Sequence, residues 1–402
     1  MRILIVAGRH PFPPRRGDEL RALQCAESLA GRHQVTLLVP DSPVAGTIPL
    51  DLPFRVETFP RRRTALPAAL LSVVSAGLPI QNAFFSYPAL GRRIAELRGD
   101  ADLVILQLVR LAGEMSALGD TPLIADLVDS LSLGFRSRAR RDRRWLRPLL
   151  DAEARRVERC EERLLDRASG GLVVSDRDRA DLASRLPSVL GKRLRTVPIA
   201  VDALGRSGGV RRDDTVVFSG NFGYFVNRDA LGWFLAEVWP GLCRARPGVR
   251  LLCVGSRVPE ALRRELARAG GKLSVDPEDL RAVLARATVA VAPLQCGSGL
   301  PIKVLEAWSA GTPVVASPWG AAGVDGAGAL EVAATPGEWI EALAGLLGSP
   351  ERRAILAAAG RSRLSSRYSR EAVRRGFLES VESVRGSRGD GARAAAVGAA
   401  AL

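Results

Sequence analysis

Residues 288–317 read "TVAVAPLQCGSGLPIKVLEAWSAGTPVVAS", and this stretch decides the fold. The apolar run at 288–295, rich in β-branched residues, is typical of a buried strand, and 312–317 is typical of a second one. A glycine loop and a short helix with Lys303 and Glu306 lie between them. Strand, loop, helix and strand in this order predict a βαβ unit with a right-handed crossover in a parallel sheet.

The same order recurs along the whole chain. We expect strands in the first half at 2–8, 34–40, 101–107, 121–129, 170–176 and 194–202. In the second half we expect them at 215–220, 249–256, 272–276, 288–295, 312–317 and 329–333. Helical spacing is found at 19–33, 151–168 and 227–245, and again in three terminal segments at 336–348, 350–368 and 369–386. The pattern predicts an α/β protein with two doubly wound, Rossmann-like domains that face each other across a cleft.

Length and composition fit two globular domains. The chain has 402 residues, and each half is long enough to bury its own core. Glycine and charge interrupt the pattern at 203–212, which predicts domains at 1–205 and 206–385. Whether the last helix crosses back to the N-terminal domain stays open. The tail at 386–402 lacks large apolar residues, so we expect it to be disordered.

Hydropathy and cysteine usage indicate where in the cell the protein is located. No stretch approaches the roughly 18 to 20 apolar residues of a spanning helix, and the N-terminus lacks a secretory signal. The 5 cysteines are scattered and odd in number, which is typical of reduced thiols in a cytosol. We expect a cytoplasmic protein. The net charge of +15 fits anionic partners, although a GC-rich genome would equally enrich arginine.

The glycine loop and the helix that follows it suit a phosphorylated ligand. Gly297 and Gly299 let the backbone approach a ligand closely, and the helix N-terminus offers N–H groups and a favourable dipole for an anion. Lys303 and Glu306 share one helix face. A diphosphate fits the loop and the lysine, and a carboxylate one turn later fits a ribose diol. The alternative is a plain intrahelical salt bridge between the two side chains.

This motif resembles the nucleotide-sugar motif of retaining glycosyltransferases with the GT-B fold, in particular glycosyltransferase family 4. The resemblance extends over roughly residues 1 to 380, and includes "RGDELRA", "LVVSDRDRADL", "TVPIAVD" and "VVFSGNFGYFVNRDALGWF". The nearest subgroup is that of bacterial sugar transferases of exopolysaccharide and cell-envelope clusters. The resemblance implies donor contacts from Gly17, Asp18, Gly220, Asn221, Val275, Gly297, Ser298, Gly299, Leu300, Lys303 and Glu306.

Two departures from the family pattern affect the donor site. The family often has a second glutamate eight positions before Glu306, where this chain has Ser298, so the donor sugar is undetermined. The loop after the first donor-domain strand often carries an arginine and a lysine that hold the diphosphate. Here that loop begins Gly220, Asn221, and the resemblance leaves the charge to Lys303 and the loop amides.

Several candidates in the first half have two interpretations. Gly17 and Asp18 either approach the donor phosphate or simply begin a helix, with Asp18 stabilised by the helix dipole. Asp126 and Asp129 follow a strand, and either position an acceptor hydroxyl in catalysis or cap the next helix. His10 and His33 are the only 2 histidines, so a zinc site is not expected, and no Asp-x-Asp signature suggests metal-dependent chemistry.

The stretch Arg136–Arg147 is the densest basic segment, with seven arginines and one aspartate beside Trp145 and Leu146. It either lies on anionic lipid at the inner face of the membrane or forms a solvated helix face. No nucleic-acid-binding module accompanies it, so nucleic acid is not an expected partner.

The resemblance implies a hexosyltransferase that needs no metal or cofactor. It would move a sugar from a nucleoside-diphosphate donor to a lipid-linked, polysaccharide-related or small-molecule acceptor, with Lys303, Asp129 and Asp126 as catalytic residues. Front-face displacement with domain closure is the implied mechanism. A nucleotide-sugar epimerase of the same fold is one alternative. A nonenzymatic nucleic-acid or dinucleotide-binding protein is another, although the opening loop lacks G-x-G-x-x-G.

Overall fold

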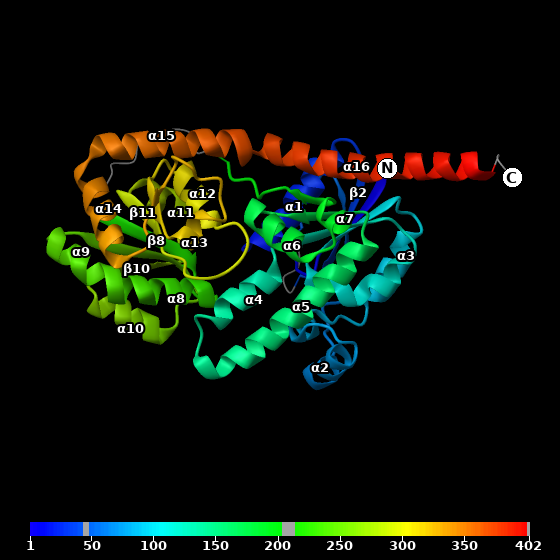
Figure 1. Ribbon diagram of the computed structural model, residues 1–402, viewed down its shortest axis with the longest axis horizontal. Coiled ribbons are helices and arrows are strands. Elements are labelled where there is room, and N and C mark those ends of the chain that lie inside the picture. Colours follow the sequence, from blue (N-terminus) through cyan, green and yellow to red (C-terminus); the bar gives the residue numbers. More distant parts are fainter. Residues whose placement is uncertain (43–47, 203–213, 400–402) are drawn as a thin grey trace. The chain divides into compact units, whose positions relative to one another are not determined.

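The computed structural model describes residues 1–42, 48–202 and 214–399, with side chains described to residue 385 (Figure 1). The chain divides into two compact units. The first comprises 1–139, 143–199 and the chain from Glu371 onward, and the second comprises 140–142 and 200–370. The predicted boundary at 205/206 falls in 203–213, outside the described residues.

The first unit is built on a 7-stranded sheet in the order β3-β2-β1-β4-β5-β6-β7, and all its pairings are parallel. Each strand predicted in the first half is present. The strands are β1 (Arg2–Val6), β2 (Gln34–Pro40), β3 (Arg55–Phe59), β4 (Leu103–Gln107), β5 (Leu123–Val128), β6 (Gly170–Val173) and β7 (Leu194–Thr196). The additional edge strand, β3, was not predicted because its alternating "RVETF" contains no continuous apolar run.

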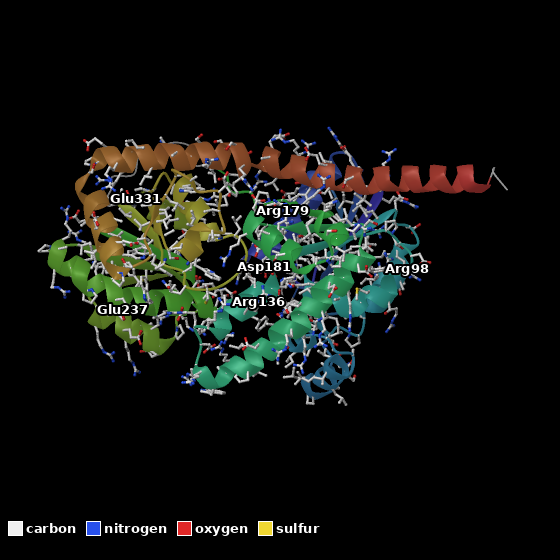
Figure 2. The ribbon with its side chains drawn as sticks, in the orientation of Figure 1. Arg98, Arg136, Arg179, Asp181, Glu237 and Glu331 are labelled. Atoms are coloured by element: carbon white, nitrogen blue, oxygen red, sulfur yellow. The ribbon has the colours of Figure 1, made fainter. Side chains whose placement is uncertain are left out.

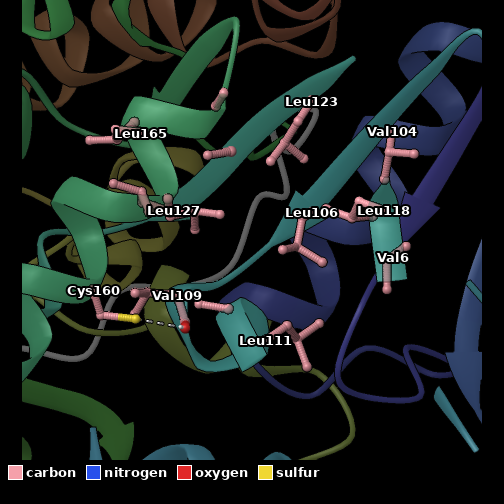
Figure 3. Close-up of a cluster of buried hydrophobic side chains, with 14 of the residues drawn as sticks. Val6, Val104, Leu106, Val109, Leu111, Leu118, Leu123, Leu127, Cys160 and Leu165 are labelled. Atoms are coloured by element: carbon pink, nitrogen blue, oxygen red, sulfur yellow. Dashed lines mark hydrogen bonds between the residues drawn. The ribbon is translucent and has the colours of Figure 1, made fainter. Parts of the chain in front are cut away.

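Helices connect the parallel strands of this unit. They are α1 (Gly17–Ala30), α2 (Leu66–Ser75), α3 (Leu90–Arg98), α4 (Leu131–Ala139), α5 (Arg147–Arg167), α6 (Asp176–Arg185) and α7 (Ser188–Gly191), with 3₁₀ turns η1 (Ile80–Phe85), η2 (Val109–Leu118) and η3 (Arg144–Leu146). The core lies between the sheet and these helices, and Figure 3 shows part of it, with the Cys160 thiol donating to the Val109 carbonyl at 4.0 Å.

The last helix, α16 (Arg370–Ala399), packs on the first unit from Glu371 onward. The Phe377 ring lies 5.1 Å from the Arg21 guanidinium of α1, and Glu382 pairs with Arg32 at 3.4 Å. The helix continues through 386–399, where the composition led us to expect disorder. Alanine has the highest helix propensity of any residue, which favours continuing the helix through this alanine-rich segment.

The second unit has a 6-stranded parallel sheet in the order β10-β9-β8-β11-β12-β13. All strands predicted in the second half are present: β8 (Thr215–Asn221), β9 (Arg250–Ser256), β10 (Lys272–Val275), β11 (Val289–Ala292), β12 (Val314–Ala316) and β13 (Glu331–Val332). The helices are α8 (Phe225–Trp233), a π-helical turn η4 (Phe234–Val238), α9 (Trp239–Ala245), α10 (Glu260–Arg268), α11 (Leu280–Ala285), α12 (Ile302–Ser309), α13 (Pro318–Ala321), α14 (Pro336–Gly348) and α15 (Pro350–Arg367).

The strand orders determine where each unit can bind a ligand. The order reverses between β1 and β4 in the first sheet and between β8 and β11 in the second. Ligands of open parallel sheets bind at such reversal points, beyond the carboxyl ends of the strands. The loops after β1 and β4, and those after β8 and β11, are therefore the expected sites of function.

Candidate active site

The loop between β11 and α12 lies at the reversal point of the second sheet. Gly297 has φ of +118° and Gly299 has φ of +80°, values that favour glycine over residues with a Cβ. The Trp319 indole N–H donates to the Gly297 carbonyl at 3.1 Å, which holds this turn against α13. The backbone then enters α12, whose first turn presents N–H groups without i−4 partners. The loop with Ser298 and Leu300 thus leads directly into a helix N-terminus suited to an anion.

Lys303, in the first turn of α12, lies between this loop and the sheet. Its Nζ donates to the Asn227 Oδ1 of α8 at 2.7 Å and lies 4.3 Å from the centre of the Phe218 ring of β8. The side chain keeps part of its surface exposed. Burial nevertheless lowers the pKa of Lys303 from 10.5 to about 7, and the charges of Glu306 and Cys253 offset only part of this effect.

Asn227 of α8 links Lys303 to the loop that lacks the family's arginine and lysine. Its Nδ2 donates to the Asn221 carbonyl at 2.9 Å, and its Oδ1 accepts from Lys303. A Cβ on Gly220 would come within 3.0 Å of the Asn227 side chain, so this glycine makes room for the amide. The predicted donor residues Gly220, Asn221 and Lys303 are thus joined through a residue that the sequence analysis did not single out.

Glu306 follows Lys303 by three residues on α12 and is partly buried. Burial raises the pKa of Glu306, while Lys303 and Arg281 act in the opposite direction. The hydrogen bond of the Lys303 ammonium goes to Asn227 rather than to this carboxylate. A simple intrahelical salt bridge therefore does not describe the pair, and the Glu306 carboxylate is available to accept hydroxyl hydrogen bonds.

Val275, one of the predicted donor contacts, lies at the end of β10. Val275 is 45 % exposed, and its neighbour Asp276 has φ of +43° with its N–H bonded to the Gly255 carbonyl at 3.1 Å. Asp279 caps α11, because its Oδ1 accepts from the Ala282 N–H at 3.0 Å.

Gly17 and Asp18 begin α1 at the reversal point of the first sheet. The Asp18 carboxylate pairs with Arg9 at 3.1 Å, and the Gln107 amide at the end of β4 donates to the Asp18 carbonyl at 2.9 Å. These contacts position the start of α1 at the carboxyl ends of β1 and β4. They are compatible with both interpretations, a helix start and a donor contact, because Asp18 begins a helix at the edge of the sheet where ligands are expected to bind.

The expectation that Asp126 positions an acceptor hydroxyl is not supported by its surroundings. The residue is only 1 % exposed, and the single Arg21 Nε–H is shared between its two carboxylate oxygens, with N···O distances of 2.8 Å and 2.7 Å. Arg21 is fully buried and also donates to the Val197 carbonyl at 2.6 Å. A carboxylate enclosed by this ion pair is not placed to orient an acceptor hydroxyl. Asp126 joins β5 to α1 and is structural.

Asp129 lies just beyond β5 and keeps partial exposure. Its N–H bonds to the Leu127 carbonyl at 2.9 Å, closing a γ-turn around Val128, which has φ of +68°. A β-branched residue rarely adopts positive φ, and such strain is maintained only where the surroundings enforce it. Strained backbone next to a polar residue at the carboxyl edge of a sheet supports a functional role for Asp129.

A network of charges holds the loop that carries Asp129. Ser130 Oγ donates to Asp181 at 2.7 Å, and Ser132 Oγ donates to the buried Glu161 at 2.7 Å. Burial raises the pKa of Glu161 to about 7, against the effect of Ser132 and Arg185. Arg185 contacts both carboxylates, and Arg136 pairs with Asp181 at 2.5 Å (Figure 2). The network was not predicted, because its members are separated in sequence by tens of residues.

The basic segment Arg136–Arg147 therefore has two parts. Arg136 belongs to the internal network and also pairs with Glu158, so it is not available to lipid. Arg143, Arg144 and Arg147 are exposed, and Trp145 between them is 70 % exposed. The surface part of the segment is thus shorter than the sequence suggested.

Among residues 1–42, 48–202 and 214–399, no group of three or more His, Cys, Asp or Glu side chains could hold a metal ion. No helix among the described residues is long and apolar enough to cross a membrane.

Residues 213–349 match the family model described as Glycosyl transferases group 1. The matched stretch extends from β8 through α14 and contains the glycine loop, Lys303 and Glu306. Residues 213–349 therefore carry a glycosyltransferase group 1 domain. No protein of curated function matches the sequence.

Solved structures match over nearly the whole chain. HepE of Anabaena in complex with UDP has a TM-score of 0.68 at 16% identity, over 95% of this chain and 100% of that one. Sucrose-phosphate synthase of Thermosynechococcus elongatus has a TM-score of 0.72 at 17% identity, over 96% and 100%. WaaG, a glycosyltransferase involved in lipopolysaccharide biosynthesis, has a TM-score of 0.62 at 15% identity, over 94% and 98%. At such identities these likenesses concern the fold, and the predicted GT-B fold of two parallel-sheet α/β units is confirmed.

Proposed function

We propose that this glycosyltransferase moves a sugar from a nucleoside diphosphate to an acceptor hydroxyl with retention of the anomeric configuration. The observation that carries the proposal is Lys303, whose ammonium lies at the start of α12 inside the matched domain, beside a loop with two positive-φ glycines. A lysine and a helix N-terminus together supply the positive charge that a diphosphate requires.

The donor is held by residues of the second unit. The diphosphate lies on the Gly297–Gly299 loop and Lys303, with Ser298 and Leu300 lining the turn and Gly220 and Asn221 opposite. The Glu306 carboxylate accepts hydrogen bonds from both ribose hydroxyls. The base lies against the backbone at Val275 and Asp276. Uridine is the first base to test, because HepE has been solved with UDP and with UDP-glucose.

Chemistry at the sugar follows from this arrangement. As the bond between the anomeric carbon and the phosphate oxygen breaks, negative charge grows on the diphosphate next to Lys303. The acceptor oxygen attacks from the same face and forms the new glycosidic bond. Its proton passes to the departing phosphate oxygen. The chain itself supplies the neutralising charge, so we propose that no metal ion or other cofactor is needed and that activity survives EDTA.

The acceptor belongs to the first unit in this proposal. Gly17 and Asp18 remain the proposed donor contacts of the β1 loop, and Asp129 positions the acceptor hydroxyl. We propose a lipid-linked or polysaccharide-related acceptor of the family 4 envelope subgroup, for which the likeness to WaaG gives support. The exposed Arg143, Arg144 and Arg147 then contact anionic lipid while the protein remains cytoplasmic.

A thermal-shift screen against UDP, GDP, ADP and their sugars tests the donor. A ligand at a hundred times its Kd stabilises the fold by about 2.7 kcal/mol. Lys303→Met should lose most of this shift, whereas Lys272→Met, at an exposed lysine of β10, is the matched control. The anomeric configuration of the product, read by NMR, tests retention. If no nucleotide raises the melting temperature of the wild type, or if the product is inverted, the proposal is wrong.

A further inference from the structure

Helix α2 is an exposed apolar element of the first unit. Its sequence, "LPAALLSVVS", has no charged residue, and only Ala69 and Val73 are buried, against Ala83 of η1. Leu71 is 73 % exposed and Val74 is 50 % exposed. Pro67, Leu71 and Val74 follow i, i+4, i+7 spacing, so these exposed residues form one line along the outer face.

Exposed apolar side chains also occur on η1, which packs against α2, and at the start of α5. Phe84 of η1 is 48 % exposed. The Gln81 N–H of η1 donates to Glu153 of α5 at 3.2 Å, which joins the two elements. Leu149 lies one turn before Glu153 on the same helix face and is 53 % exposed.

Basic residues border this surface. Residues 64–91 contain no charge, but Arg61 and Arg62 precede them and are exposed, and Arg63 stacks on Tyr87 at 5.6 Å. Arg144 in η3 and Arg147 at the start of α5 are also exposed and flank the exposed Trp145 in sequence. Apolar side chains with arginines at the margins are typical of proteins that lie in the interfacial region of a membrane.

We infer that α2, η1 and the start of α5 form a docking surface that inserts apolar side chains into an anionic lipid bilayer. The 10 residues of α2 extend about 15 Å, half of the roughly 30 Å hydrocarbon core, so the helix lies in the interface and does not span it. This inference rests on the membrane contact proposed above and adds the element that enters the lipid. We infer lipid rather than a protein partner because anionic headgroups can pair with all of the bordering arginines.

Sedimentation with vesicles tests the inference on the full chain. Wild type should bind vesicles with about a third phosphatidylglycerol and bind pure phosphatidylcholine weakly. Leu71→Glu/Val74→Glu should reduce the partition coefficient at least tenfold, about 1.4 kcal/mol. Ile355→Glu, on α15 and 66 % exposed, is the matched control and should bind as wild type.

Brominated lipids provide a second measurement that needs no substitution on α2. Trp145 is 70 % exposed, whereas the other tryptophans are buried or partly buried, so quenching on binding reports its depth. Trp145→Phe should remove most of the quenching. If the α2 variant does not fold, Leu71→Ser/Val74→Ser replaces it.

The possible results separate this inference from the proposals above. Charge reversal at Arg143, Arg144 and Arg147 that abolishes binding, with an α2 variant that binds as wild type, overturns the inference and leaves the electrostatic contact standing. The same holds if α2 substitutions only convert a dimer to a monomer in sedimentation velocity. Wild type that ignores anionic vesicles, or Trp145 that is not quenched, also overturns it. The thermal shift with UDP should be the same in every α2 variant.

Discussion

Titration of Lys303 should couple donor binding to pH. The ammonium is enclosed by Asn227 and Phe218, and burial lowers its pKa to about 7. A bound diphosphate favours the charged form and raises this pKa again. Binding above pH 7 therefore takes up a proton. Donor affinity should be constant below pH 7 and fall about tenfold for each pH unit above it.

The magnitude follows from the protonated fraction. At pH 7 about half of the molecules carry the charge, and at about pH 9 only about one in a hundred do. If the protonated lysine alone holds the diphosphate, affinity falls roughly fiftyfold between these values, about 2.3 kcal/mol. Stability of the free protein changes in the opposite direction. The unfolded chain keeps the proton up to 10.5, so the wild type gains stability over Lys303→Met as pH rises from about 7.

Isothermal titration with UDP-glucose in buffers of different ionisation enthalpy measures both the affinity and the proton uptake. Lys303→Arg is the informative control, because arginine stays charged throughout this range and should give a pH-independent affinity. Lys303→Met should bind weakly at every pH. A wild-type affinity that does not change between about pH 6 and about pH 9, or an equal slope in Lys303→Arg, would show that this lysine does not face the diphosphate.

Substitutions at Asp126, Glu306 and Asp129 test the roles assigned to these three carboxylates. Asp126→Ala leaves the buried Arg21 charge without a partner and should lower the unfolding free energy in urea by about 3 to 5 kcal/mol. The double variant Asp126→Leu/Arg21→Met should recover most of this loss. Equal stability of the wild type and both variants would contradict the structural role of Asp126. Glu306→Gln should weaken UDP binding about tenfold or more at an unchanged melting temperature, since hydrogen bonds to a charged group contribute about 1.5 to 3 kcal/mol; unchanged affinity removes the ribose contact. Asp129→Asn should lower kcat with the donor Kd intact, and normal turnover would assign Asp129 to the loop structure alone.

Much of the fold was readable because buried parallel strands are continuous apolar runs. Residues 216–218 and 289–292 are such runs, and the rule that ligands bind at the carboxyl ends of strands placed Lys303 near the site. Strand β3 escaped prediction because Arg55 and Glu57 break the run. The contact between Lys303 and Asn227 was not predicted for another reason. Asn227 lies 76 residues away, and only the pairing of β8 with β11 brings α8 and α12 together.

The two aspartates of "IADLVD" show where sequence reasoning ends. Both follow the same apolar run, and both were predicted to face a ligand. Asp126 still pairs within the sheet and meets Arg21, 105 residues earlier in the chain. Two residues later, at Val128, the register has shifted and φ is positive, and the chain leaves the sheet at Asp129. A valine gives no sign of that conformation, because β-branched residues rarely adopt positive φ. The distinction between a structural and a functional carboxylate therefore depends on tertiary contacts that no local pattern contains.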